Sequence, residues 1–206
     1  MTQDPENLLL IFTRNPELGK CKTRLAASVG DETALDIYVF LLKHTVSVTQ
    51  DLALTKEVYY SRAIRENDLW DPEVYQKKMQ WGADLGERMS NAFEAGFKAG
   101  YKRIAIIGSD LYDLSKEDLE KAFKMLRSNN FVLGPATDGG YYLLGMTQFI
   151  PAIFENKDWG TSTVLPDTLA DLKNINVYLL ETKNDVDVLE DIADIPAFQP
   201  FLKNIL

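Results

Sequence analysis

The fold of this chain is decided by the stretch NLLLIFT at residues 7–13, an unbroken apolar run that leads directly into polar and cationic residues. A continuous apolar run of this length is typical of a strand that is buried on both faces of a parallel sheet. The run RIAIIG at residues 103–108 has the same character. Two such runs predict the centre of a mainly parallel sheet.

Outward from these two strands, strand-like and helix-like segments alternate along the chain. Further strands are expected at residues 55–61, 74–81, 131–136, 141–145 and 175–181. Helices are expected at residues 31–50, 84–99, 115–128, 162–172 and 186–193, followed by an irregular tail. This alternation indicates βαβ units. The length of 206 residues favours one domain over residues 1–206.

Three of the expected helices carry start signals. Asp31 and Asp84 are suitable N-caps, and Ser115 with Asp118 has the spacing of a capping box. In the helix at residues 31–50, a buried face is predicted by four apolar residues at helical spacing, namely Leu35, Val39, Leu42 and Val46.

Composition excludes several classes of protein. The chain carries 31 acidic against 22 basic side chains, a net charge of -9, which disfavours binding to nucleic acid or to an anionic membrane. It has no apolar stretch long enough for a membrane span and no secretion signal at its start. Cys21 is the single cysteine, so a disulfide framework is excluded and a reducing, cytoplasmic location is expected. A homodimer is left open.

The loop after the first strand concentrates positive charge in an otherwise acidic chain. Its cations are Arg14, Lys20, Lys22 and Arg24, opposed by Glu17. Gly19 permits a turn, and Thr23 can begin a short helix whose free N–H groups face the loop. Backbone donors combined with cationic side chains favour phosphate binding. The alternative is a solvated basic turn, and the Walker A pattern is absent.

Carboxylates follow the later strands. Asp110 comes directly after the strand at residues 103–108, where a buried carboxylate needs a partner such as Mg²⁺. The alternative is a turn or capping aspartate. After the strand at residues 175–181 come Asp185 and Asp187, of which one is expected to cap the next helix and the other to complete a metal site with Asp110.

The segment Asp138-Gly139-Gly140 has two interpretations, which can hold together. Two glycines after an aspartate allow a backbone to approach a ligand closely, and Asp-Gly also favours a tight hairpin turn. In a similar way, Arg88 is expected either to bind phosphate or to pair with Glu87 or Asp84, and Trp159 either to lie over a substrate or to belong to the core.

Neither Cys21 nor His44 is expected to be catalytic. His44 is the single histidine and lies within a predicted helix, and no G-x-S-x-G elbow is present. These features disfavour covalent hydrolase chemistry and zinc sites of the Cys/His kind.

Five short motifs, in this order, resemble the DUF2064 family, whose members are similar to glycosyltransferase A-type proteins. They are Pro16–Gly19 with Lys22–Leu25, Asp84–Met89, Gly108–Asp110, Asp138–Tyr142 and Asp185–Asp187. More distantly, the order is similar to nucleotidyltransferases of the MobA and CofC type. The resemblance covers nearly the whole chain. It implies a three-layer α/β/α, Rossmann-like nucleotide-diphospho-sugar transferase (GT-A) fold.

The resemblance also implies a chemistry. It predicts a transferase that uses a nucleotide-activated donor, most simply a nucleoside-diphospho-sugar, and a small-molecule acceptor. Mg²⁺ or Mn²⁺ would be held by Asp110 with Asp187 or Asp185, and Asp138 would lie near the acceptor as a general base. The residues expected to bind the nucleotide or its phosphates are Arg14, Gly19, Lys22, Arg24, Gly86, Arg88, Gly139 and Gly140.

Two other functions stay open. The first is a nucleotidyltransferase that joins an NTP to a phosphorylated acceptor and releases pyrophosphate. The second is a nucleotide-binding module without turnover, which is kept open because Leu111-Tyr112 stands where the family usually has a proline.

Overall fold

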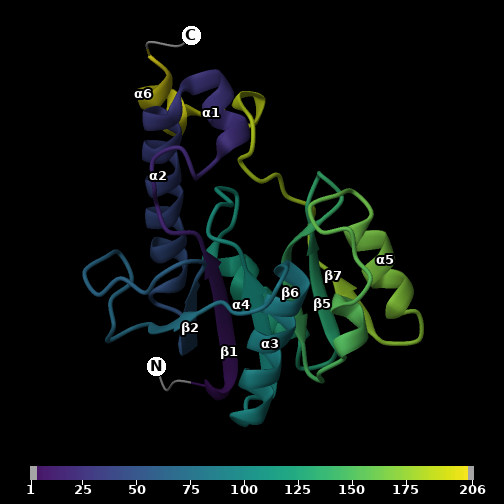
Figure 1. Cartoon of the computed structure of the whole chain (residues 1–206). Coiled ribbons are helices and arrows are strands. Elements are labelled where there is room, and N and C mark those ends of the chain that lie inside the picture. Colours follow the sequence, from purple (N-terminus) through teal and green to yellow (C-terminus); the bar gives the residue numbers. More distant parts are fainter. Residues whose placement is uncertain (1–3, 204–206) are drawn as a thin grey trace.

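The centre of the molecule is a sheet, described here from a computed structural model that covers residues 4–203 (Figure 1). Within those residues the sheet has seven strands in the order β3-β2-β1-β4-β6-β5-β7. The strands are β1 (Asp4–Thr13), β2 (Leu54–Tyr60), β3 (Gln76–Met79), β4 (Arg103–Ile107), β5 (Phe131–Pro135), β6 (Tyr141–Met146) and β7 (Val177–Leu179).

Most neighbouring strands run parallel, as predicted. Strand β1 lies between β2 and β4 and is parallel to both, β3 is parallel to β2, and β7 is parallel to β5. Strand β6 is antiparallel to both β4 and β5, because the short turn at residues 137–140 can join only antiparallel neighbours. The carboxyl ends of β1, β2 and β4 therefore meet at one edge.

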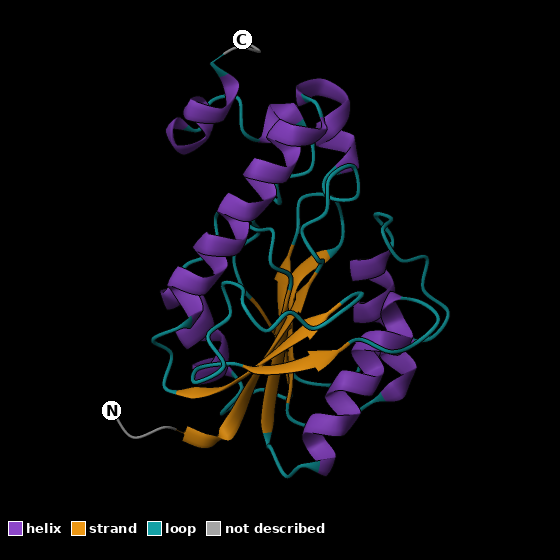
Figure 2. Ribbon diagram, turned by 60° about the vertical axis from the view of Figure 1, so that its left-hand side comes forward, coloured by secondary structure: helices purple, strands orange, loops and turns teal. Residues whose placement is uncertain are grey.

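Helices cover both faces of the sheet and complete the predicted three-layer α/β/α arrangement (Figure 2). The sheet is covered by α2 (Asp31–Thr49), α3 (Leu85–Lys98), α4 (Lys116–Met125) and α5 (Val164–Asp171), whereas α1 (Thr23–Val29) and α6 (Gln199–Leu202) pack on one end of α2. Single 3₁₀ turns occupy Pro151–Phe154, Leu189–Asp191 and Pro196–Phe198.

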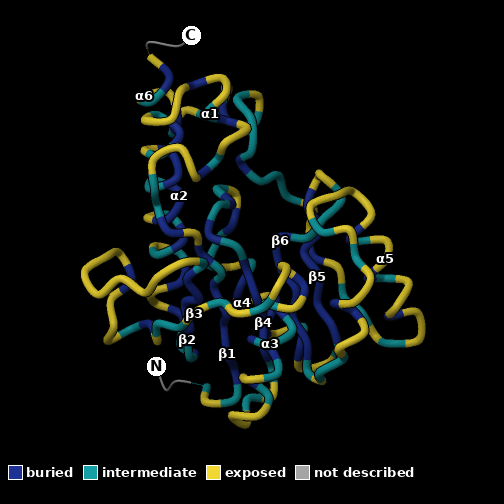
Figure 3. Tube along the Cα trace, in the orientation of Figure 1, coloured by how far each residue is buried: buried dark blue, intermediate teal, exposed yellow. Residues whose placement is uncertain are grey.

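The period-two alternation of β1 divides the core between the two faces. Leu9 and Ile11 belong to the cluster under α2 and α4, whereas Leu8 and Leu10 belong to the cluster under α3. All four side chains are fully buried. Figure 3 shows this buried centre, with exposed residues concentrated in the surrounding loops.

Two helix starts are confirmed and one is wrong. The Asp84 side chain accepts the N–H of Glu87, and Ser115 forms its capping box with Asp118. Helix α2, however, has Gly30 rather than Asp31 as its N-cap, because α1 ends at the preceding residue. The buried face of α2 is also rotated from the predicted one, since it is formed by Ala34, Ile37, Tyr38, Leu41, Leu42, Thr45 and Thr49.

The C-terminal segment differs from its prediction. The helix expected at residues 186–193 is a single 3₁₀ turn, because Asp191 accepts the N–H groups of Asp187 and Val188 and closes the chain locally. The tail is not irregular, since it contains a 3₁₀ turn and α6. Its apolar residues Phe198 and Leu202 pack with α1 and α2 in a third cluster, which lies at the top of Figure 1.

No helix within residues 4–203 is both long enough and apolar enough to cross a membrane.

Candidate functional site

A cavity of about 530 Å³ opens at the carboxyl ends of β1, β2 and β4. We call it the cation-lined cavity, and it is bounded by Thr13, Arg14, Lys20, Arg62, Arg88 and Asp110, among others. Four of its side chains are cationic, and two, Glu17 and Asp110, are acidic. Ligands of open α/β sheets bind at such strand ends. The charge balance of this cavity favours an anionic ligand.

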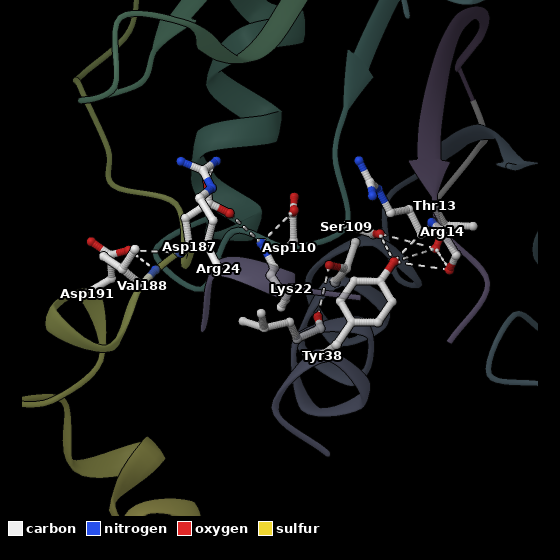
Figure 4. Close-up of polar contacts among 12 residues, drawn as sticks. Thr13, Arg14, Lys22, Arg24, Tyr38, Ser109, Asp110, Asp187, Val188 and Asp191 are labelled. Atoms are coloured by element: carbon white, nitrogen blue, oxygen red, sulfur yellow. Dashed lines mark hydrogen bonds and ion pairs between the residues drawn. The ribbon is translucent and has the colours of Figure 1, made fainter. Parts of the chain in front are cut away.

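The Tyr38 hydroxyl group forms hydrogen bonds that connect the residues at the base of the cation-lined cavity. It accepts the Arg14 N–H at 3.0 Å and lies 3.3 Å from Ser109 Oγ, which itself donates to Thr13 Oγ1 at 3.1 Å (Figure 4). The carboxyl ends of β1 and β4 are thereby tied to α2. Burial raises the pKa of Tyr38, so its phenol stays neutral.

Lys22 joins residues that are far apart in the sequence. Its ammonium group donates to Asp110 Oδ2 at 2.8 Å and to Asp187 Oδ1 at 3.2 Å, and its side chain is 4% exposed. Burial lowers the pKa of Lys22, but the two carboxylates outweigh burial and leave the pKa raised. The group is therefore a permanent cation. Figure 4 shows it between the two aspartates.

The backbone of Lys22 is unusual as well. Its φ of 49° lies in the left-handed region, which a lysine seldom adopts, and it forms the N-cap of α1 without a side-chain cap. Strained residues of this kind persist where the surrounding structure holds them, often at functional sites. Here the two ion pairs fix the side chain in its position.

Arg24 is arranged differently from Lys22. It pairs with the Asp187 carboxylate, but its side chain is 70% exposed. Arg14, Lys22 and Arg24 line a small recess of about 130 Å³ together with Asp110 and Asp187. The structure thus brings together the predicted phosphate-binding cations and two of the predicted metal ligands.

Asp185 is the most perturbed carboxyl of the group. Burial, followed by the charges of Asp138, Asp187 and Asp110, raises the pKa of Asp185 to about 6. The other three predicted carboxylates are therefore close enough to Asp185 to influence it. Within residues 4–203, no group of three or more His, Cys, Asp or Glu side chains has the arrangement of a metal site, so the bound metal stays a prediction.

The two carboxylates that converge on Lys22 nevertheless fit a divalent cation chemically. Asp110 and Asp187 supply hard oxygen ligands, which Mg²⁺ and Mn²⁺ prefer. Both already hold one cation, the Lys22 ammonium group. A metal ion would share these carboxylates with Lys22 or take its place.

A second cavity, of about 230 Å³, adjoins the first. We call it the apolar cavity, and it is bounded by Phe12, Met89, Tyr141, Trp159, Asp138 and Asp185, among others. Phe12, Leu85 and Gly108 line both cavities. Trp159 therefore lines a cavity and also packs against the core, and a contact with substrate stays a prediction.

The glycines of the predicted site are held by protein contacts. A Cβ at Gly86 would lie 2.6 Å from Phe154 O and would overlap Trp159, and one at Gly139, where φ is 90°, would lie 2.6 Å from Ser162 O. The Gly140 N–H donates to Asp138 Oδ1 at 2.8 Å, as in a hairpin turn. Gly19 has a φ of 68° in the loop turn. Phosphate binding by these glycines stays a prediction.

Arg88 lines the cation-lined cavity, and its Nε donates to Gly82 O at 3.1 Å. The Gly82 carbonyl group, rather than Glu87 or Asp84, therefore orients the Arg88 side chain. Cys21 is buried beside the loop and His44 contacts Leu114 O at 2.8 Å, which agrees with their predicted structural roles.

The sequence interpretation missed Tyr38, Ser109 and Asn15. Asn15 is buried and ties the first loop to the segment after β2, since its side chain contacts the backbone of Arg62 and Ala63. Polarity at an otherwise buried strand end was the signal for Asn15 and Ser109, whereas Tyr38 lies within α2 and carried no such signal.

Comparisons with known proteins agree on the fold. The family model described as "Uncharacterized protein conserved in bacteria (DUF2064)" matches residues 42–161. A crystal structure from Desulfovibrio desulfuricans G20, provisionally described as a nucleotide-diphospho-sugar transferase, is 30% identical, with a TM-score of 0.86 over 97% of this chain and 94% of that chain. Among curated proteins, no significant match is found.

More distant structures share the architecture. The 4-diphosphocytidyl-2C-methyl-D-erythritol synthase of Anaerococcus prevotii DSM 20548 has a TM-score of 0.61 at 10% identity, over 97% of both chains. A cytidylyltransferase of Leptospira borgpetersenii has a TM-score of 0.55 at 13% identity, over 91% of this chain and 83% of that chain. The fold is therefore the predicted Rossmann-like nucleotide-diphospho-sugar transferase fold.

Proposed function

This chain belongs to the DUF2064 family, and from that premise we propose that it is a transferase using a nucleotide-activated donor, most simply a nucleoside-diphospho-sugar. The observation that carries the proposal is the cation-lined cavity at the strand ends, next to the Lys22 ammonium group held between Asp110 and Asp187. The description of the Desulfovibrio desulfuricans relative supports the same reaction class.

The cations are proposed to bind the donor phosphates. Arg14, Lys20, Arg62 and Arg88 line the cavity, and Lys22 and Arg24 line the adjoining recess. Preorganised charges of this kind stabilise the negative charge that develops on a leaving diphosphate, an effect worth several kcal/mol in a site that excludes water. Arg24 is exposed and free to reorient toward a ligand, whereas Lys22 is already fixed.

Mg²⁺ or Mn²⁺ is proposed as the cofactor, with Asp110 and Asp187 as the protein ligands. A bound metal ion would neutralise charge on the diphosphate. Asp185 is the weaker candidate, because it lines the apolar cavity, whereas Asp110 and Asp187 converge on the Lys22 ammonium group.

Asp138 is proposed to lie near the acceptor. It is at the tip of the β5–β6 hairpin and lines the apolar cavity, where its carboxylate can take a proton from an acceptor hydroxyl. Because Phe12, Leu85 and Gly108 line both cavities, donor and acceptor would meet above the end of β4.

The first experiment is thermal stabilisation by a panel of nucleotides. UDP, GDP, CDP and ADP, their sugars and the NTPs are each tested with and without Mg²⁺ or Mn²⁺. A ligand at about 100 times its Kd adds about 2.7 kcal/mol, which gives a clear melting shift. A shift with one base and a preference for the nucleotide-sugar supports the proposal. No shift with any nucleotide rejects it.

The metal ligands are tested with a matched pair of variants. Asp110→Asn is expected to abolish the metal-dependent part of the nucleotide shift, whereas Asp113→Asn, an exposed aspartate three residues further on, is expected to retain it. An unchanged metal-dependent shift in Asp110→Asn would remove Asp110 from the site.

The two other functions differ in their products. A nucleotidyltransferase would release pyrophosphate from an NTP in the presence of a phosphorylated acceptor, and a binding module would bind nucleotide and release nothing. Measurement of pyrophosphate and of free nucleoside diphosphate in the same reactions separates all three.

A further inference from the structure

We propose that the apolar cavity selects an acceptor without phosphate, namely a neutral hydroxyl compound with an apolar body. The inference rests on the proposed function, because it names the acceptor class of that same site. It follows from three observations: the charge of the lining residues, their apolar surface and the position of the cavity beside the cation-lined cavity.

The charged groups along the cavity have one sign. Asp138 and Asp185 line it, and no Lys, Arg or His within residues 4–203 does so. The cation-lined cavity has the opposite composition, with four cations against two acids. A phosphate ester in the apolar cavity would face two carboxylates at short range without a counter-ion, which is unfavourable in a partly desolvated site.

The remaining lining is mainly apolar and includes aromatic rings, with Thr161 as a polar member. Phe12, Met89, Tyr141 and Trp159 contribute side chains from β1, α3, β6 and the loop before α5. Such surfaces favour an apolar or ring-shaped ligand body, and a few polar groups orient it. Asp138 and Asp185 are acceptors, so they suit ligands with hydroxyl donors. The volume of about 230 Å³ fits a small molecule or the end group of a larger one.

The position of the cavity fits an acceptor. Gly108, at the carboxyl end of β4, lines both cavities, and Asp110 follows two residues later. In glycosyl transfer, the acceptor hydroxyl oxygen bonds to the anomeric carbon while the bond from that carbon to the diphosphate oxygen breaks. The nucleoside diphosphate leaves with the electron pair, and Asp138 receives the hydroxyl proton.

The test compares neutral compounds with their own phosphate esters, by ligand-detected NMR on the intact chain. A panel of hydroxyl compounds is used, including phenyl β-glucoside against its 6-phosphate and benzyl alcohol against benzyl phosphate. We expect neutral members to bind at least about tenfold more tightly than their esters. In Asp138→Asn/Asp185→Asn, the difference is expected to fall to about threefold or less, because the repelling charges are gone.

The matched control is Asp158→Asn, which removes one exposed charge from the neighbouring loop, outside the apolar cavity. It is expected to keep the full preference. Tighter binding of the esters, a preference that ignores the Asp138 and Asp185 substitutions, or no binding by any neutral compound would each overturn the inference. The assay needs no donor, so a failure of the nucleotide panel is a separate result that rejects the proposed function.

Discussion

The two cavities at the carboxyl edge of the sheet share Phe12, Leu85 and Gly108, yet they carry opposite charge. The cation-lined cavity takes its cations from the loops after β1 and β2 and from α3. The apolar cavity takes its two acids from the β5–β6 turn and from the segment after β7. The comparison teaches that one sheet edge can offer adjoining sites for an anion and for a neutral compound, because each strand end contributes its own loop.

The largest effect is expected from removing the Lys22 ammonium group, which pairs with Asp110 beside the cation-lined cavity and with Asp187. Lys22→Met is expected to lower the free energy of unfolding by about 2–3 kcal/mol, because Asp110 and Asp187 would lose their shared partner. The value is below that of a fully buried pair because both carboxylates are partly exposed. Denaturant unfolding measures it.

The control for this change is Lys98→Met, on the exposed side of α3, where the lysine pairs with Glu94 alone among the residues described. A change of less than about 0.5 kcal/mol is expected there. Equal stability losses in the two variants would mean that the Lys22 ion pairs contribute no more than a surface pair.

The second-largest effect is expected from a substitution in the wall of the apolar cavity. Gly86→Ala is expected to cost about 2 kcal/mol, because its Cβ would meet Phe154 O at 2.6 Å and overlap Trp159. Gly86→Ala is also expected to weaken the binding of neutral ligands in the apolar cavity. Gly145→Ala is the milder comparison, since its Cβ would first meet the flexible Leu126 side chain at 3.0 Å. A Gly86 variant as stable as the parent would contradict the contact.

A smaller effect is the pH dependence of stability that Asp185, a residue of the apolar cavity, is expected to cause. The folded protein raises the pKa of Asp185 from 3.8 to about 6, so its neutral form is favoured on folding. The associated stability is present in acid and is lost as the pH rises through about 6. Asp185→Asn is therefore expected to exceed the parent in stability by about 1 kcal/mol near pH 8, after allowance for solvent screening.

The measurement is thermal unfolding in EDTA across the pH range. At about pH 3, below the unfolded-state pKa of 3.8, the advantage of Asp185→Asn is expected to vanish, because the parent carboxyl is then largely protonated in both states. Asp158→Asn, which changes an exposed carboxyl, serves as the control. An advantage that is constant with pH would show that the amide itself, rather than the lost charge, stabilises the variant.

The smallest expected effect needs no mutation and is the difference in salt dependence between ligand binding in the two cavities. Raising the salt concentration from about 50 mM to about 500 mM is expected to weaken nucleotide binding several-fold, since exposed cations such as Arg24 are screened. Neutral ligands of the apolar cavity are expected to change by less than about twofold. Parallel salt titrations check both, and equal slopes would remove the charge distinction.

The sheet and the contributing strand ends could be predicted because their signals are local. The apolar runs at residues 7–13 and 103–108 mark the two central strands, and parallel strands end at a common edge. This rule was enough to expect Lys22, Asp110 and Asp187 at one edge although they are distant in sequence. The direct contacts of Lys22 with both aspartates depend on side-chain geometry, which periodicity does not contain.

The parts that could not be predicted depend on tertiary packing. Tyr38 reads as an aromatic core residue, and its hydroxyl acquires a role only where β1 and β4 end together. The rotated face of α2 and the packed tail share one cause, since Phe198 and Leu202 supply partners for the first half of α2. The apolar cavity is similarly assembled from six segments that are distant in sequence.

The contact between Gly86 and Trp159 has a mechanical consequence. The first turn of α3 and the loop before α5 are packed without space for a single methyl group. Leu85 faces both cavities from that same turn, and Arg88 faces the cation-lined one. Side chains from one helix start therefore border both cavities, and the loop that carries Trp159 packs directly against that helix start. A displacement of the loop or of the helix start would have to move the other, so the walls of the two cavities are mechanically coupled at this contact.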